Sequence, residues 1–289
     1  MISVTSIQEV REFVFDAKAK GKLVGLVPTM GSLHDGHLSL VKDCREQCEI
    51  VVMSIFVNPI QFDRKDDLAA YPVDLENDKL LAEKAGVDLL FIPDTKTMYV
   101  LPKIFVVVDG LNEHLCGATR PGHFMGVLTI VAKLFNIVSP DIAVFGQKDF
   151  QQVRIVQKMV TDLNFPIKIV VALTVREESG LAMSSRNKNL SPDQRERAVC
   201  IYAALKAAAS MIKQGERSWR VVEKEMHKII KKGSPDKIEY ISAVANLDLM
   251  PIKVLEGNFL IAVAAYFGST RLIDNAVIII DEKRVVCAI

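Results

Sequence analysis

Apolar residues along this chain fall into short β-type runs that alternate with segments of helical periodicity. The runs are rich in valine and isoleucine, and they predict strands at residues 22–27, 50–57, 88–92, 104–108, 141–145 and 167–173. Helical spacing of apolar positions predicts helices at 36–47, 74–85, 123–138 and 149–162. Because strands buried on both faces read as continuous apolar runs, this order predicts an α/β fold, a Rossmann-like doubly wound parallel sheet.

Capping signals mark two further helix starts. Ser6 and Glu9 form a capping box, and the helix that follows is expected to end near Gly21. A second capping box, from Ser191 to Gln194, has proline at the first helical position and predicts a helix to about residue 214.

The pattern changes after residue 189, where strands and helices no longer alternate. A helix is predicted at 218–232, and β-type segments follow at 237–245 and 258–266. We therefore expect two domains, a Rossmann-like domain at 1–176 and a smaller C-terminal α+β domain at 177–289.

The composition is typical of a soluble globular protein. The 289 residues are 50% apolar and 25% charged, and the formal net charge is +1, which gives no bulk attraction to nucleic acid or an anionic membrane. No apolar run reaches the ~18–20 residues of a spanning helix, and residues 1–20 show no signal-peptide pattern. The five cysteines are scattered without zinc spacing, as expected for reduced thiols in a cytoplasm.

The segment 27–37, VPTMGSLHDGH, is the richest in candidate chemistry. It places Gly31, His34, Gly36 and His37 between a predicted strand and a predicted helix. A glycine-rich turn lets the backbone approach a phosphate, and a helix N-terminus adds partial positive charge. Two imidazoles on one face of a helical turn can donate hydrogen bonds to charge that develops when an α-phosphate is attacked. The segment therefore predicts ATP binding.

Two other interpretations of the histidine pair remain open. The histidines could cap the helix or lie in an exposed surface turn. A zinc site is disfavoured, because no third ligand has suitable spacing and a catalytic HExxH motif needs one more residue between its histidines.

Further motifs follow other predicted strands. NPIQF at 58–62 follows the second, GQKD at 146–149 follows the run that ends at 145, and TVRE at 174–177 follows the run that ends near 173. Ligands of doubly wound sheets lie beyond the carboxyl ends of the strands, so these motifs are expected to share one site. Lys148 is a point charge suited to a β- or γ-phosphate, although it could also be a surface lysine at a helix start.

Five segments in this order resemble the pantoate–β-alanine ligase (pantothenate synthetase) family of HIGH-motif nucleotidyl transferases. They are VPTMGSLHDGH at 27–37, FVNPIQF at 56–62, RPGHFMGVLTIVAKLFNIVSPD at 120–141, FGQKDFQQ at 145–152 and TVREESGLAMSSRN at 174–187. The resemblance is dense over residues 22–190 and looser beyond them.

The resemblance implies an ATP-dependent ligase that condenses (R)-pantoate with β-alanine through a pantoyl-adenylate, giving pantothenate, AMP and diphosphate. It also implies that the C-terminal domain closes over the ATP site and that the enzyme is a cytoplasmic homodimer. His37, His34, Lys148 and Arg186 are the implied catalytic residues. The implied ATP-binding residues are Met30, Gly31, Ser32, Leu33, His34, Asp35, Gly36, His37, Gly146, Gln147, Lys148, Asp149, Val175, Met183, Ser184, Ser185 and Arg186.

The same resemblance assigns an acid-binding set. It places Gln61 and Gln152 on pantoate, with Met30 and Phe56 lining an apolar wall and Asn58 nearby. A neutral amide can donate to a carboxylate or a hydroxyl without locking it in an ion pair. By their sequence alone, Gln61 could be an ordinary loop residue and Gln152 an ordinary helix-surface residue.

The chain departs from the family pattern at several positions. Gln147 stands where glutamate is more common, and Cys116 stands where an acid is common. For Mg²⁺, the expected cofactor with ATP, Asp78 is the candidate ligand, while Asn77 replaces an acid found in some relatives. Arg120 is expected to orient phosphate or a neighbouring loop, and His123 to be structural.

Two alternative functions are weighed against this one. Another HIGH-type nucleotidyl transferase with a phosphorylated acceptor would favour arginine or lysine in place of the paired glutamines. A catalytically dead nucleotide-binding module is suggested by Gln147 and Cys116, but the catalytic set is intact.

Overall fold

The computed structural model describes residues 1–281 and 284–289. Its internal contacts divide the chain into two compact units. Unit 1 comprises Met1–Asn112, Gly117–Gly146 and Gln152–Ala172, and unit 2 comprises Glu113–Cys116, Gln147–Gln151 and Leu173–Ile289. The domain boundary after residue 176 stays a prediction, because compactness alone does not show which part folds as a domain.

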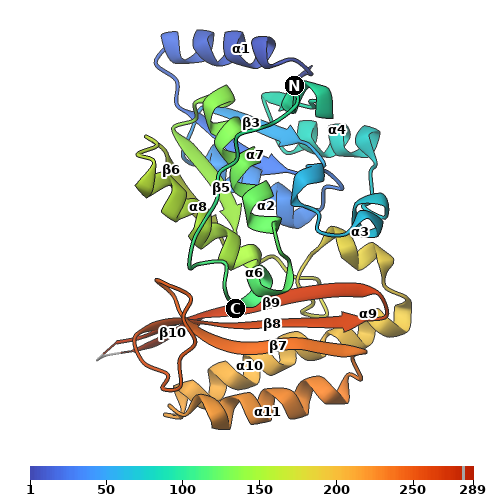
Figure 1. The fold of residues 1–289 in the computed structure, drawn as a ribbon, viewed down its shortest axis with the longest axis vertical. Helices are drawn as coiled ribbons and strands as arrows, with labels where there is room; N and C mark the ends of the chain where they lie inside the picture. Colours follow the sequence, from blue (N-terminus) through green and yellow to red (C-terminus); the bar gives the residue numbers. More distant parts are fainter. Residues whose placement is uncertain (282–283) are drawn as a thin grey trace. The chain divides into compact units, whose positions relative to one another are not determined.

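Unit 1 is built on a six-stranded sheet in the order β1-β4-β3-β2-β5-β6, and all neighbouring strands run parallel (Figure 1). The strands are β1 (Ile2–Val4), β2 (Val24–Thr29), β3 (Ile50–Ile55), β4 (Leu89–Phe91), β5 (Ile142–Gly146) and β6 (Lys168–Ala172). The longer helices between them are α1 (Ile7–Ala19), α2 (Asp35–Arg45), α4 (Leu75–Lys84), α7 (His123–Val138) and α8 (Phe150–Asp162). Short helical segments are η1 (Pro59–Gln61), α3 (Lys65–Ala69) and α5 (Thr95–Met98), and α6 (Leu115–Thr119) is divided between units 1 and 2.

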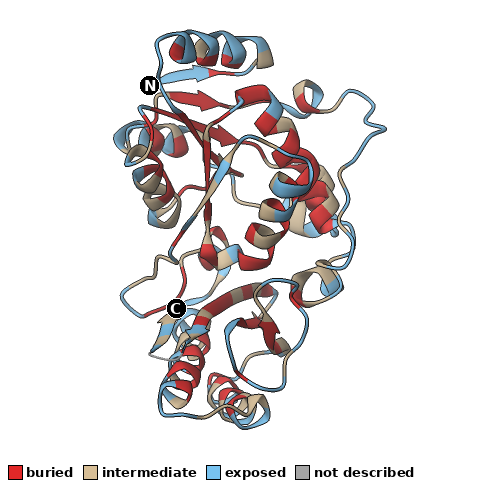
Figure 2. Ribbon diagram, turned by 90° about the vertical axis from the view of Figure 1, so that its left-hand side faces the viewer, coloured by how far each residue is buried: buried red, intermediate tan, exposed pale blue. Residues whose placement is uncertain are grey.

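Apolar side chains cover both faces of this sheet. Met53 and Leu90 pack with residues of α2 and α4 in one apolar cluster. Their chain neighbours Val52 and Leu89 are also fully buried, and successive side chains of a strand point to opposite faces. Figure 2 shows the strands largely in the colour of buried residues. The predicted doubly wound parallel sheet is therefore confirmed.

Unit 2 holds an antiparallel sheet in the order β10-β9-β8-β7. Its strands are β7 (Lys237–Ala245), β8 (Asn258–Phe267), β9 (Thr270–Ile280) and β10 (Val285–Ala288). Its helical segments are η2 (Gln147–Asp149), η3 (Ser185–Asn189), α9 (Pro192–Ala198), α10 (Cys200–Lys213) and α11 (Trp219–Lys232). Helices α10 and α11 run along one face of the sheet (Figure 1), and Leu205, Met226 and Phe259 meet in the core between them.

Two predicted elements differ from the structure. The strand predicted at 104–108 is wrong: the segment pairs with no strand of the described residues, and Ile104 is 87% exposed. The helix predicted from Ser191 to about residue 214 is two helices, because the Val199 N–H turns back to Glu196, three residues earlier. Both capping boxes are confirmed.

Among the helices of the described residues, none combines the length and the apolar character that a membrane span requires.

Candidate active site

The glycine–histidine segment forms the turn between β2 and α2. Gly31 and Ser32 both have positive φ, 82° and 51°, which turns the backbone sharply after the strand. His34 is the N-cap residue of α2, and the His37 N–H donates to its carbonyl at 2.7 Å. The two imidazole rings lie with centroids 4.1 Å apart. The structure thus brings both predicted histidines together at a helix N-terminus, where backbone and side-chain donors favour an anion.

Asp78, carried by α4, supports this turn through hydrogen bonds to its backbone. Its Oδ2 accepts the Ser32 N–H at 2.8 Å and its Oδ1 accepts the Leu33 N–H at 2.7 Å. The residue is 1% exposed, and a Cβ at Gly31 would lie 2.8 Å from its Oδ2. Glycine therefore lets the turn close onto the carboxylate, and Asp78 holds the turn in place.

This arrangement is a poor fit to a metal ligand. The Asp78 carboxylate faces two backbone donors and is shielded from solvent. Over residues 1–281 and 284–289, no group of three or more His, Cys, Asp or Glu side chains is placed to hold a metal ion. Asp78 can be picked out in the sequence as a candidate ligand, but its hydrogen bonds to the turn cannot, because the partners lie 45 and 46 residues away in the chain.

The acid-binding candidates gather after β3, where the chain forms η1. Asn58 and Gln61 are 1% and 8% exposed, and the Asn58 Nδ2 donates to the Gln61 Oε1 at 3.0 Å. The Gln61 Nε2 lies 3.0 Å from the Met30 Sδ, in the segment that leads into the histidine turn. Phe56 is buried two residues before Asn58. Four of the five predicted acid-site residues therefore lie at the carboxyl ends of the neighbouring strands β2 and β3.

Gln152 is the fifth predicted residue of this set. It is half-buried on the first turn of α8. Its contact with the acid stays a prediction.

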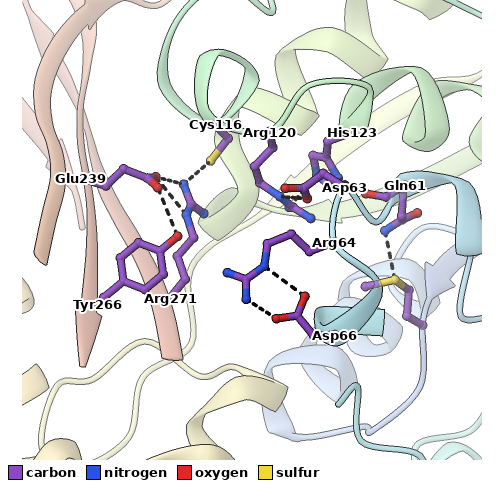
Figure 3. A network of polar contacts seen from close by, with 11 residues as sticks. Gln61, Asp63, Arg64, Asp66, Cys116, Arg120, His123, Glu239, Tyr266 and Arg271 are labelled. Carbon is purple, nitrogen blue, oxygen red and sulfur yellow. Dashed lines mark hydrogen bonds and ion pairs between the residues drawn. The ribbon is translucent and has the colours of Figure 1, made fainter. Parts of the chain in front are cut away.

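A chain of polar contacts fixes the backbone at Gln61 (Figure 3). The His123 Nδ1 lies 2.7 Å from the Gln61 carbonyl, which can only accept, so Nδ1 carries the proton. The His123 Nε2 then accepts from Arg120 at 3.1 Å, and Arg120 also pairs with Asp63 at 3.1 Å. Arg120 therefore pairs with the loop after η1 and His123 contacts the Gln61 carbonyl, while a contact of Arg120 with phosphate stays a prediction.

Of the GQKD motif, Gly146 ends β5 in unit 1, while residues 147–149 belong to unit 2, where the buried Asn275 of β9 holds them. The Asn275 amide donates to the carbonyls of Gln147 and Lys148 at 3.0 and 2.9 Å. The Gln147 Nε2 donates to the Ala288 carbonyl of β10 at 3.1 Å and lies 3.4 Å from the Asn275 Oδ1. The Lys148 Nζ is 3.9 Å from Asp149. A glutamate at 147 could not make the two donations when ionised, which explains the amide in this chain.

The TVRE and MSSR motifs form one folded-back segment of unit 2. The Met183 N–H donates to the Val175 carbonyl at 3.0 Å, and the chain turns between them. Ser184 caps η3 by accepting from the Arg186 N–H, and the Asn187 amide donates to Glu177 at 2.8 Å. The candidate phosphate residues Ser184, Ser185 and Arg186 are therefore held against the segment that carries Val175.

Cys116 belongs to a polar network of unit 2 (Figure 3). Its Sγ lies 3.2 Å from the Tyr240 hydroxyl and 3.5 Å from Arg271, which forms an ion pair with Glu239 at 2.5 Å. Burial raises the pKa of the Tyr240 hydroxyl well above its ordinary value. Glu239 supplies the carboxylate that pairs with Arg271. The guanidinium therefore keeps an acidic partner, although residue 116 is a cysteine and not an acid.

Comparisons with known proteins agree on one family. A family model described as Pantoate-beta-alanine ligase matches residues 2–277. The chain is 50% identical to the pantothenate synthetase of Moorella thermoacetica over 279 residues, which cover 96% of this chain and 98% of that protein. It is 48% identical to the pantothenate synthetase of Carboxydothermus hydrogenoformans, with 96% and 99% covered.

Solved structures give the same result. The pantothenate synthetase of Thermus thermophilus is 42% identical and superposes with a TM-score of 0.89, covering 95% of this chain and 98% of that one. A pantoate-beta-alanine ligase from Francisella tularensis, solved with "Beta-gamma ATP and Beta-alanine", is 35% identical with a TM-score of 0.81, and 95% and 97% are covered.

Proposed function

This chain belongs to the pantoate-beta-alanine ligase family, and on that basis we propose how its own residues bind the substrates and promote the reaction. The protein is an enzyme, a ligase of pantothenate biosynthesis that forms pantothenate from pantoate and β-alanine at the expense of ATP. Another nucleotidyl transferase or a catalytically dead module is not favoured, because full-length relatives at about half identity are pantothenate synthetases.

The chemistry requires two displacements. A carboxylate oxygen of pantoate attacks the α-phosphorus of ATP, and the bond from the α-phosphorus to the oxygen that bridges to the β-phosphate breaks. Diphosphate leaves, and AMP stays attached to the acid. The β-alanine nitrogen then attacks the acyl carbon, the bond to the AMP oxygen breaks, and the nitrogen releases a proton. Neither step needs a nucleophilic side chain, so positioning and charge stabilisation are what the protein supplies.

The geometry at the ends of β2 and β3 carries this proposal. His34 and His37 lie together at the N-terminus of α2, and Met30, four residues before His34, contacts Gln61. The paired imidazoles donate to charge on the α-phosphate, while Gln61 and Gln152 bind pantoate with neutral donors. Met30 and Phe56 line the apolar side of that subsite.

The remaining phosphate contacts are proposed from unit 2. Lys148 and Arg186 neutralise the departing diphosphate, Ser184 and Ser185 donate to its oxygens, and Asp149 binds the nucleotide ribose. The Val175 backbone meets the adenine. Motif position and the hydrogen bonds that fix η2 and η3 support these roles.

Magnesium is proposed to reach the enzyme with ATP, because Mg²⁺ leans on substrate phosphates and keeps several waters. It would neutralise phosphate charge there. A direct contact with Asp78 stays a prediction, and the burial and hydrogen bonds of that carboxylate stand against it.

The enzyme is further proposed to be a cytoplasmic homodimer. All five cysteines are free thiols, as expected for a reducing compartment. The segment after α5 exposes large apolar side chains, with Val100, Leu101 and Ile104 at 82%, 84% and 87% exposure. Exposed apolar side chains gathered on one segment fit burial against a second copy of the chain.

Isotope exchange tests the order of chemistry. With enzyme, Mg²⁺ and pantoate but no β-alanine, labelled diphosphate should enter ATP, because adenylate formation is reversible by itself. Omitting pantoate should abolish the exchange, since water is a poor substitute in a closed site. Exchange that requires β-alanine, or ADP as the product, would contradict the adenylate mechanism.

A further inference from the structure

The candidate acid subsite contains two side-chain amides whose orientations are linked. The Asn58 Nδ2 lies 3.0 Å from the Gly126 carbonyl and 3.0 Å from the Gln61 Oε1. The Tyr99 hydroxyl donates to the Asn58 Oδ1 at 2.9 Å, and the Gln61 Nε2 lies 3.0 Å from the Met30 Sδ. All five residues belong to unit 1.

The Gly126 carbonyl determines which atom donates and which atom accepts in each of these contacts. A carbonyl oxygen can only accept, so the Asn58 atom that faces it must be the amide nitrogen. The opposite atom of Asn58 is then the oxygen, which needs a donor, and the Tyr99 hydroxyl supplies one. Burial raises the pKa of the Tyr99 hydroxyl, so it stays protonated at neutral pH.

The orientation of the Asn58 amide in turn determines the orientation of the Gln61 amide. Its atom at 3.0 Å from the Asn58 nitrogen must be the oxygen, so its amide nitrogen is turned to the other side, toward Met30. Without a partner of fixed polarity, a glutamine amide could rotate by half a turn and present its oxygen instead. The amide orientation is therefore imposed by residues that are 41 and 68 positions from Asn58 in sequence.

Close packing makes this control possible. A Cβ at Gly126 would lie 2.5 Å from the Gln61 Cα, so only glycine lets α7 approach η1 at this point. Asn58 is 1% exposed, which leaves water little opportunity to replace either of its fixed partners.

We propose that Tyr99 is a positioning residue that, with the Gly126 carbonyl, fixes Asn58 and makes Gln61 present only N–H donors to the bound acid. The subsite then accepts an oxygen that carries lone pairs, such as a carboxylate or a hydroxyl oxygen, and rejects a group that can only donate, such as an ammonium, at that position. This inference rests on the proposed function, since it concerns the residue proposed to bind pantoate.

Two variants test the inference by steady-state kinetics. Tyr99→Phe keeps the ring, whose centroid is 6.1 Å from that of Phe56, but removes the donor to Asn58. We expect the KM for pantoate to rise about tenfold, the effect of losing one hydrogen bond in a buried chain, with kcat and the KM for ATP changed less than about twofold. Asn58→Asp puts an oxygen against the Gly126 carbonyl and the Gln61 oxygen, so a larger rise in the pantoate KM is expected.

Tyr266→Phe is the matched control. It removes a tyrosine hydroxyl that donates to Glu239 in unit 2, at 3.3 Å, and should leave the KM for pantoate unchanged. Thermal unfolding of each variant separates loss of fold from loss of positioning. A side-chain ¹⁵N spectrum with Gln61 assigned gives a second readout, because its NH₂ signals should shift on adding pantoate in the wild type and shift less in Tyr99→Phe.

The possible outcomes distinguish a failure of the proposed function from a failure of the positioning role of Tyr99. A wild-type enzyme that forms no pantothenate would overturn the proposed function itself. An active wild type in which Tyr99→Phe leaves the pantoate KM unchanged, or raises the KM values for pantoate and ATP equally, would overturn the positioning role while the function stands.

Discussion

At the scale of single residues, Gln147 shows how one atom decides which side chain a buried position accepts. Its amide nitrogen donates to the Ala288 carbonyl and faces the Asn275 oxygen, and the residue is 4% exposed. Both neighbours are acceptors, so a donor is required there. The hydrogen bond from Gln147 to Ala288 attaches β10 to η2 within unit 2.

Gln147→Glu should therefore lower the free energy of unfolding by about 1–3 kcal/mol at pH 8, because a buried carboxylate would face two acceptors. Burial raises the pKa of such a carboxyl in the folded state, so the loss should shrink as the pH falls toward 5 and the acid gains a proton. Urea unfolding at the two pH values measures this. Equal stability of the variant and the wild type at pH 8 would contradict the assignment of these hydrogen bonds.

The histidine pair gives a second prediction at this scale. His37→Ala removes the donor that we propose for the developing charge, and it should lower the rate of diphosphate–ATP exchange by about 10²–10³-fold, equivalent to about 2.7–4 kcal/mol. His227→Ala, on α11 of unit 2, is the control and should retain the rate. Near wild-type exchange in His37→Ala at saturating ATP would exclude this histidine from the mechanism.

At the scale of elements, the turn from β2 to α2 depends on α4. The turn uses two successive positive φ angles and has two backbone donors that point to Asp78. No helix or strand pairing satisfies those donors, so the carboxylate defines the conformation in which the histidines are presented.

Asp78→Asn tests this dependence. The amide replaces one acceptor with a donor that faces a backbone N–H, so we expect about 1–3 kcal/mol less stability and a KM for ATP raised by about tenfold or more. Asp74→Asn is the matched control, since Asp74 is exposed and caps α4 through the Asn77 N–H at 3.3 Å. An Asp78→Asn enzyme with wild-type ATP kinetics would show that the turn keeps its shape without the carboxylate.

At the scale of the whole molecule, the exposed segment after α5 predicts how the chain associates. If the chain forms the proposed dimer, Leu101→Glu combined with Ile104→Glu should shift it to monomer, because each protomer would bury two charges on association. Light scattering coupled to size exclusion measures the mass over a range of concentrations. Leu247→Glu, at a residue of unit 2 that is 78% exposed, should leave the mass unchanged. A wild type that is monomeric at all concentrations would refute the dimer.

The sequence by itself determined the features that depend on near neighbours. Alternating β-type runs and helical periods require a sheet covered on both faces, and the structure has that sheet. The Gly31–His37 turn was also predictable, because a strand, two glycines and a helix start lie within one short segment. The meeting of the motifs after β2 and β3 was predictable as well, because the carboxyl ends of parallel strands lie at the same edge of a sheet.

Only the tertiary structure decided the features that join distant segments. The run at 104–108 has strand composition, yet no strand lies beside it within the described chain, since pairing depends on a partner and not on propensity. Asp78 under the histidine turn, Tyr99 on Asn58 and Gln147 on Ala288 join residues 46, 41 and 141 positions apart. Such contacts have no periodicity in the sequence, and the polarity of a buried amide is set by which atoms the fold places around it.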